Sequence, residues 1–114
     1  MAASALPPSP YPFSLQLTTS NDVSVLKCTG CLTCETSEIL RSQVKKLLPE
    51  HKNIELDLTD LHFIDSSGLG TLLSTYVSAR TAGCEFRLVN PSPSVTSLLK
   101  LTHLASVLET YGTE

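Results

Sequence analysis

Several residue types are scarce in this sequence, and each shortage excludes a class of protein. Its 114 residues include no tryptophan, one methionine and only 17% charged residues. No run of about 18 apolar residues occurs, so we expect no membrane insertion. Eight basic against eleven acidic side chains give a formal charge of −3. Because no electropositive surface is available to neutralise a phosphate backbone, we expect no nucleic-acid partner.

The first ten residues also lack features of a targeting segment. They have neither the basic start nor the continuous apolar stretch of a secretory signal, so we expect a cytoplasmic protein. Four cysteines are present, and Cys28, Cys31 and Cys34 lie close together. Since 114 residues with 41% hydrophobic side chains can bury one core without covalent links, we interpret the cysteines as reduced thiols.

The hydrophobic pattern predicts alternating strands and helices within one domain. Residues 1–12 contain four prolines and are expected to form a flexible leader, and residues 13–114 are expected to form the domain. The predicted elements are a hairpin from Phe13 to Cys28 with its turn at Ser20–Asp22, a helix from Thr36 to Leu48, a strand from Asn53 to Leu58 followed by a short loop to Ile64, a helix from Leu69 to Ala82, a strand from Glu85 to Asn90, and a short helix from Val95, with Val107 and Leu108 docking last. This order predicts an α/β fold with a mixed sheet of about four to five strands packed with helices.

The second predicted helix has a stripe of large apolar residues at helical spacing. Its members are Leu69, Leu72, Leu73, Tyr76 and Val77, which we expect to lie on the core. On either side of Leu69, Gly68 and Gly70 are expected to keep the strand-to-helix corner free of bulk.

The segment from Asp57 to Gly70 is where the sequence points to chemistry. It places Ser66 and Ser67 at or just before a helix N-terminus, beside exposed amides and the positive end of the helix dipole. Simple helix capping is one interpretation, because aspartate and serine are favoured N-cap residues. For Asp65 two readings stay open: an N-cap, or an acceptor that orients the Ser66 hydroxyl or a kinase's metal ion.

The chain from about Phe13 to Tyr111 resembles the STAS domain of bacterial anti-sigma factor antagonists. The resemblance rests on Asp57-Leu-x-x-Leu-x-Phe-Ile-Asp-Ser-Ser-Gly-Leu-Gly, on Leu72-Leu and Tyr76, on Leu88-Val-Asn-Pro-Ser-Pro-Ser-Val95, and on Leu98-Leu-x-Leu-Thr102. In that family the serine directly after the aspartate is phosphorylated. The matching residue is Ser66, with Ser67 as the alternate acceptor.

The resemblance implies a partner switch without catalysis by the domain itself. It implies that the unmodified protein binds an anti-sigma factor with serine kinase activity and so releases a sigma factor. Phosphorylation then ends the binding, and a PP2C-type phosphatase restores it. The implied partner-binding residues are Asp65, Ser66, Ser67, Gly68, Leu69, Gly30, Cys31 and Thr33.

Two places depart from the family pattern. Many members carry a Gly-Glu-x-Asp-like element after the second strand, whereas this chain has Gly30-Cys-Leu-Thr33 and lacks both acidic residues. This departure leaves partner binding through that edge open, or implies a different partner. The usual Thr-Gly-Leu near the C-terminus is Thr102-His-Leu104, which removes a glycine from a turn.

Two other functions remain open beside the switch. A STAS scaffold that is not phosphorylated, such as a subunit of a lipid-transport ATPase complex, is the first alternative. A metal or redox module built on the cysteines is the second, although zinc ligation would need a fourth ligand from Cys84, His51, His62 or His103. We expect no metal, no cofactor and no enzymatic activity, because Ser66 lacks a Gly-x-Ser-x-Gly elbow and no histidine can be placed against it.

Overall fold

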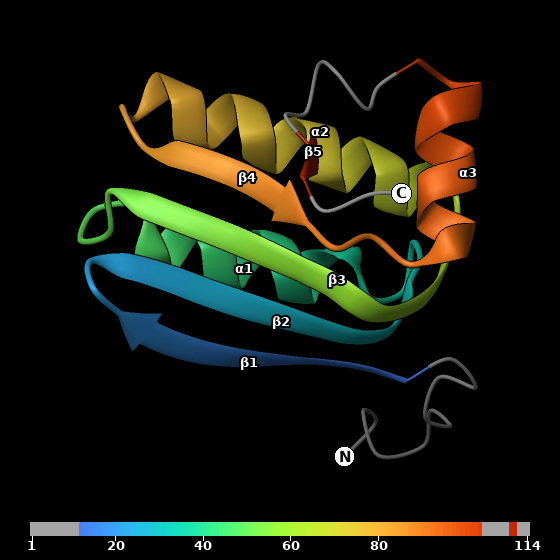
Figure 1. Cartoon of the computed structure of the whole chain (residues 1–114), viewed down its shortest axis with the longest axis horizontal. Coiled ribbons are helices and arrows are strands. Elements are labelled where there is room, and N and C mark those ends of the chain that lie inside the picture. The colour runs from blue at the N-terminus through green and yellow to red at the C-terminus, as the bar shows by residue number, and fades with distance from the viewer. Residues whose placement is uncertain (1–11, 104–109, 112–114) are drawn as a thin grey trace, which may run out of the picture.

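The computed structural model describes residues 12–103 and 110–111, which form one α/β domain (Figure 1). Its elements are β1 (Phe13–Ser20), β2 (Val23–Leu32), α1 (Ser37–Leu47), β3 (Asn53–Ile64), α2 (Ser66–Thr81), β4 (Glu85–Val89), α3 (Pro93–Leu101) and β5 (Thr110–Tyr111). The predicted α/β class and the predicted order of elements up to α3 are confirmed. Within the described residues, no helix is long and apolar enough to cross a membrane.

The five strands form one mixed sheet in the order β1-β2-β3-β4-β5. The β1–β2 pair is antiparallel, and every other neighbouring pair is parallel. Figure 1 shows α1 and α2 side by side behind the sheet and α3 near the end where β3 and β4 finish. The core lies between the sheet and these helices and is built mainly from leucines, with Phe86 as its largest fully buried side chain.

The hairpin turns where the sequence predicts, but the turn has two residues because Ser20 belongs to β1. Asn21 and Asp22 join β1 to β2 with φ angles of 50° and 66°. Two consecutive positive φ values are those of the turn type whose twist matches paired strands, and asparagine and aspartate tolerate that conformation. The turn therefore determines the register, with Ser20 opposite Val23.

The predicted loop after Leu58 is wrong, because β3 continues to Ile64. The register against β2 shifts twice, between Lys27 and Thr29 and again between Gly30 and Cys31, and each shift gives β3 one extra residue. A bulge of this kind exchanges the faces of the residues that follow it. Buried side chains consequently recur at every third residue, namely Leu58, Leu61 and Ile64, and this spacing conceals the strand from a search for strict alternation.

Helix α2 begins at Ser66, as expected for a serine at or just before its N-terminus, and most of the predicted apolar stripe lies on the core. Leu72 is fully buried, and half-buried Leu69, Leu73 and Tyr76 pack against the core, which confirms the prediction for these four. The prediction is wrong for Val77, which is exposed. The rest of the buried face consists of small residues, Gly68, Thr71, Thr75 and Ala79. Small side chains on this face let α2 approach α1 and the sheet closely. The buried face therefore includes small residues that a search for large apolar side chains does not find.

Gly68 is the residue that brings α2 closest to the sheet. A Cβ atom at this position would lie 2.2 Å from the carbonyl oxygen of Leu32 and 2.8 Å from Cγ1 of Ile64. At Gly70 nothing lies within 4 Å of such an atom. The expected lack of bulk is therefore required at Gly68, and the same expectation is wrong for Gly70.

The C-terminal part contains a strand that the sequence pattern does not reveal. The two residues of β5 pair with Leu88 and Val89 of β4, too short a strand to show a period. Val107 and Leu108, predicted to dock on the core, lie outside the described residues, as do residues 1–11 of the predicted leader. His103, at the position of the expected glycine, adopts a left-handed conformation with a φ of 60°.

We predict opposite effects of alanine at the two glycines of α2. Gly68→Ala should lower the free energy of unfolding by about 3 kcal/mol, because its methyl group would overlap the Leu32 backbone. Gly70→Ala, the matched control, should raise it by up to about 1 kcal/mol through better helix propensity. Chemical denaturation measures both values, and equal effects would contradict the proposed close contact.

We also predict that His103→Gly stabilises the domain by about 1 kcal/mol, because glycine adopts a positive φ without the steric cost of a side chain. His103→Ala separates this backbone effect from loss of the imidazole, and should leave the stability nearly unchanged. Thermal unfolding of the three proteins measures the difference. A glycine variant no more stable than the alanine variant would show that the turn carries no strain.

Candidate functional site

The predicted serine corner lies where β3 ends and α2 begins. Asp65 is the N-cap of α2: its carboxylate Oδ1 accepts a hydrogen bond of 2.8 Å from the amide of Gly68. Its backbone carbonyl accepts a second bond, of 2.9 Å, from the amide of Leu69. The structure thus supports the interpretation of Asp65 as an N-cap, because its carboxylate binds a backbone amide of the first turn of α2. The carboxylate does not bind the neighbouring Ser66 hydroxyl.

Ser66 and Ser67 are the first two residues of α2, and both are exposed. Across residues 12–103 and 110–111, the Ser66 hydroxyl has no hydrogen-bond partner, and the amides of Ser66 and Ser67 have no acceptor. The first amides of any helix lack acceptors within that helix and carry its positive partial charge. The corner therefore presents a free hydroxyl beside two free donors.

The end of β2 lies directly against this corner. The amide of Asp65 donates a 3.2 Å hydrogen bond to the Leu32 carbonyl, and the same carbonyl contacts Gly68. Cys31 and Leu32 pair with Phe63 and Ile64 of β3. The structure consequently brings together the two predicted partner-binding segments, residues 30–33 and 65–69, although they are far apart in the sequence.

Within the segment from β2, Gly30 and Thr33 have evident structural roles. Gly30 has a φ of 108°, and a Cβ atom there would lie 1.9 Å from the Pro12 carbonyl oxygen. Thr33 is 6% exposed, and its carbonyl accepts a 2.7 Å hydrogen bond from the Ser37 hydroxyl at the start of α1. Cys31 is half-buried. A partner at this edge would therefore contact mainly Cys31 and the exposed Cys34.

Next to the corner, the surface has apolar side chains that the sequence pattern does not single out. Phe63 is 49% exposed and Leu101 is 77% exposed. They line a hollow of about 380 Å³ between the end of β3 and α3, whose other lining residues are Ile64, Ser94, Ser97 and Leu98. Because of the two bulges in β3, Ile64 faces the core and Phe63 faces outward. In the sequence, the three-residue spacing of Leu58, Leu61 and Ile64 was the pattern that could have predicted this surface.

The four thiols are held in unlike surroundings. Burial, together with the Asp57 charge, raises the pKa of the Cys28 thiol to about 12, and burial likewise raises the pKa of Cys84. Cys34 is exposed on the turn before α1. Among the residues that the structure describes, no three potential ligands gather to hold a metal ion. The geometry therefore gives the metal module no support.

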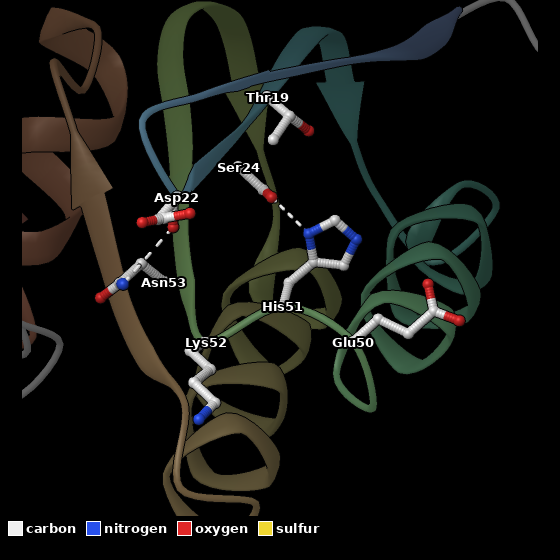
Figure 2. A pocket seen from close by; sticks show the side chains of 7 residues that line it. All are labelled: Thr19, Asp22, Ser24, Glu50, His51, Lys52 and Asn53. Carbon is white, nitrogen blue, oxygen red and sulfur yellow. Dashed lines mark hydrogen bonds between the residues drawn. The ribbon is translucent and has the colours of Figure 1, made fainter.

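A second polar site, which sequence reasoning missed, lies at the opposite end of the strands. Figure 2 shows His51, from the loop between α1 and β3, directed at Ser24 of β2, and the Ser24 hydroxyl is hydrogen-bonded to Nδ1 of the ring. The surrounding hollow has a volume of about 470 Å³ and is lined by Thr19, Asp22, Ser24, Glu50, His51, Lys52 and Asn53. No motif links Ser24 to His51, because 26 residues separate them in the sequence.

This serine and histidine do not form a hydrolytic triad. Although Ser24 borders the hollow, it is only 1% exposed, which leaves a substrate little access to its hydroxyl. Within the described part of the chain, no carboxylate is bonded to the second ring nitrogen of His51, whereas a Ser-His-Asp triad includes such an orienting group. The bond instead attaches the α1–β3 loop to the sheet.

We predict that Asp65→Ala lowers the free energy of unfolding by about 1 kcal/mol, because the amide of Gly68 loses its acceptor. Asp65→Asn, which retains a side-chain oxygen, should restore most of that loss. Urea denaturation measures both variants. An alanine variant as stable as the parent would show that the cap does not hold the corner.

The family of the chain follows from comparison with known proteins. The model of the STAS domain family matches residues 14–114. The anti-sigma F factor antagonist of Paenibacillus polymyxa is 31% identical over 94 residues, which cover 81% of this chain and 80% of that protein. The anti-sigma-B factor antagonist of Bacillus subtilis is 25% identical over 89 residues, covering 78% and 81%.

Solved structures show the same fold. An anti-sigma factor antagonist from Mycobacterium paratuberculosis superimposes with a TM-score of 0.81 at 23% identity, covering 92% of this chain and 90% of that one. SpoIIAA matches in its unphosphorylated form with a TM-score of 0.70 at 24% identity, covering 90% of each chain. Its phosphorylated form matches at 0.67 and 23%, covering 90% and 93%. The expected resemblance is confirmed: this chain belongs to the STAS-domain family of anti-sigma factor antagonists.

Proposed function

We propose that this protein is a cytoplasmic partner switch controlled by phosphorylation of Ser66. Unmodified, it binds an anti-sigma factor that is also a serine kinase, and the sigma factor is released. The kinase phosphorylates Ser66 and the complex separates, and a PP2C-type phosphatase returns the protein to its binding form. The observation that carries this proposal is the exposed Ser66 hydroxyl, without a partner among the described residues, on the first residue of a 16-residue helix.

The fold is suited to carry a phosphate at Ser66 without rearranging. The modification breaks no hydrogen bond in the described structure, because the hydroxyl makes none there. The free amides of Ser66 and Ser67 lie at the positive end of the α2 dipole, where anions are stabilised.

A cation also approaches the first turn of α2. The Arg41 guanidinium donates to the Thr71 hydroxyl at 3.1 Å, and that hydroxyl donates to the Ser67 carbonyl at 3.0 Å. Arg41 is shared with Glu38, which lies 3.1 Å away. This contact places positive charge on the side of α2 that faces α1.

The effect of phosphorylation on binding would therefore arise at the surface. A phosphate adds about −1.5 to −2 charges beside the Asp65 carboxylate. The neighbouring surface carries exposed Phe63 and Leu101, whose burial would favour a complex. Because a charged phosphate next to such an apolar contact must lose its water when a partner covers it, the modified form should bind more weakly.

The second strand suggests how the partner differs from that of other family members. The Gly30-Cys-Leu-Thr33 stretch carries no acidic side chain, and Thr33 is buried. Within these four residues a basic side chain of a partner finds no acidic counterpart, and the next acidic residue along the chain is the exposed Glu35. We propose that recognition at this edge relies on packing around Cys31 and Cys34.

We predict that incubation with ATP and the kinase partner, obtained by affinity capture on the unmodified protein, adds one phosphate to the chain. Ser66→Ala should abolish the modification, because it removes the acceptor hydroxyl, while Ser67→Ala, the matched control, should retain it. Intact-mass spectrometry measures the modification. A phosphate that persists in Ser66→Ala and disappears in Ser67→Ala would transfer the role to the alternate acceptor.

Binding distinguishes the switch from the scaffold. Ser66→Asp should remain folded by circular dichroism and should bind the partner at least ten-fold more weakly than the parent. A Ser66→Asp protein that binds as tightly as the parent, in a chain that no captured kinase phosphorylates, would contradict the switch. Such a result would favour the unphosphorylated scaffold.

A further inference from the structure

Strand β1 forms one edge of the sheet, away from the serine corner. β1 is eight residues long, stands at the end of the sheet order and pairs only with β2 within the described residues. Figure 1 shows it as the outermost strand on its side of the sheet. An edge strand presents unpaired backbone donors and acceptors to any chain that approaches it.

The hairpin turn determines which backbone groups face outward. In a hairpin with a two-residue turn, the residues that flank the turn form a hydrogen-bonded pair, and such pairs alternate along the strands. Ser20 and Val23 flank the turn, so the even-numbered residues of β1 bond to β2. The backbone N–H and C=O groups that face outward belong to Phe13, Leu15, Leu17 and Thr19.

This edge lacks the features that usually prevent strand pairing. Natural edges are protected by charged side chains, prolines, bulges or short length. The sequence of β1, Phe13-Ser-Leu-Gln-Leu-Thr-Thr-Ser20, contains no charge and no proline, and its eight pairs with β2 run without a register shift. The opposite edge strand, β5, is only two residues long. Among the residues that the structure describes, none therefore closes the sheet on the β1 side.

We propose that this edge pairs with the β1 strand of a second copy of the chain. Two identical strands related by a two-fold axis pair in antiparallel fashion. Only a register centred on Gln16 pairs all four outward-facing residues of each strand with one another, Phe13 with Thr19 and Leu15 with Leu17. The two copies then share about eight backbone hydrogen bonds and form one continuous sheet.

The side chains of β1 are self-complementary in this register. Leu15 and Leu17 lie on the same face of the strand, which is the face that contacts the core through Leu15. Leu17 is 39% exposed at the margin of that core. Pairing places Leu17 of each copy beside Leu15 of the other, so a row of four leucines covers the margin. With no charge on either strand, no like charges oppose one another.

The dimer leaves the serine corner accessible. β2 lies between β1 and β3 in the sheet, and Ser66 follows β3. The proposal therefore does not depend on the partner switch, and either can fail without the other.

Cysteine cross-linking tests the register. In it, Gln16 faces Gln16 of the other copy as a non-hydrogen-bonded pair, with Cα atoms about 4.5 Å apart, within the range of a disulfide. Gln16→Cys, in a full-length chain in which Cys34→Ser removes the exposed native thiol, should form a covalent dimer on mild oxidation. Thr18→Cys in the same background is the matched control, because Thr18 faces Ser14 of the other copy and should cross-link several-fold less.

A charge on the edge tests the interface without cross-linking. Leu17→Lys should raise the dimer dissociation constant at least ten-fold, because it places two ammonium groups against the leucine row. Thr18→Lys adds the same charge on the other face of β1 and should have a smaller effect. Analytical ultracentrifugation measures the dissociation constants, and circular dichroism confirms that each variant is folded.

Three results would overturn the proposal. One is a parent chain that remains monomeric at concentrations of hundreds of micromolar, as it would if the edge were covered by another segment of its own chain or reserved for another protein. Another is equal cross-linking of Gln16→Cys and Thr18→Cys. The third is a dimer that Leu17→Lys does not weaken.

Discussion

The close contact between Gly68 and the Leu32 carbonyl is the constraint on which the functional end of this domain depends. No side chain separates α2 from the end of β2, so the amide of Asp65 reaches the same carbonyl. Asp65 can then cap α2, and its cap fixes Ser66 as the first residue of the helix. Any residue larger than glycine at position 68 would displace the first turn of α2, and the Ser66 hydroxyl with it.

That arrangement separates the chemistry of the switch from the stability of the fold. The cap and the glycine contact hold the corner, whereas the Ser66 hydroxyl makes no contact that the described structure needs. A group in this situation can gain a phosphate at little cost to folding. The proposed phosphorylation therefore affects binding at the surface beside Phe63 and Leu101, where a partner must remove water.

Much of this architecture was predictable because it depends on local signals. The positive φ angles of Asn21 and Asp22 follow from residues that tolerate them, and the strand-helix-strand order follows from short-range periodicity. The end of β3 was not predictable, because its two bulges are defined only against β2. The outward direction of Phe63 was hidden for the same reason. The Ser24–His51 bond depends on the α1–β3 loop meeting the start of β2, which no local pattern encodes.

By itself, the sequence determined the fold class, the family and the identity of the serine at the helix start, because these depend on short motifs and on the alternation of apolar residues. Only the tertiary structure decided what surrounds that serine. In the folded protein Asp65 caps α2, Thr33 is buried, Gly70 faces open space and β1 lies at an edge of the sheet. The physical reason is that burial, close approach and strand pairing are relations between segments distant along the chain, and packing alone brings those segments together.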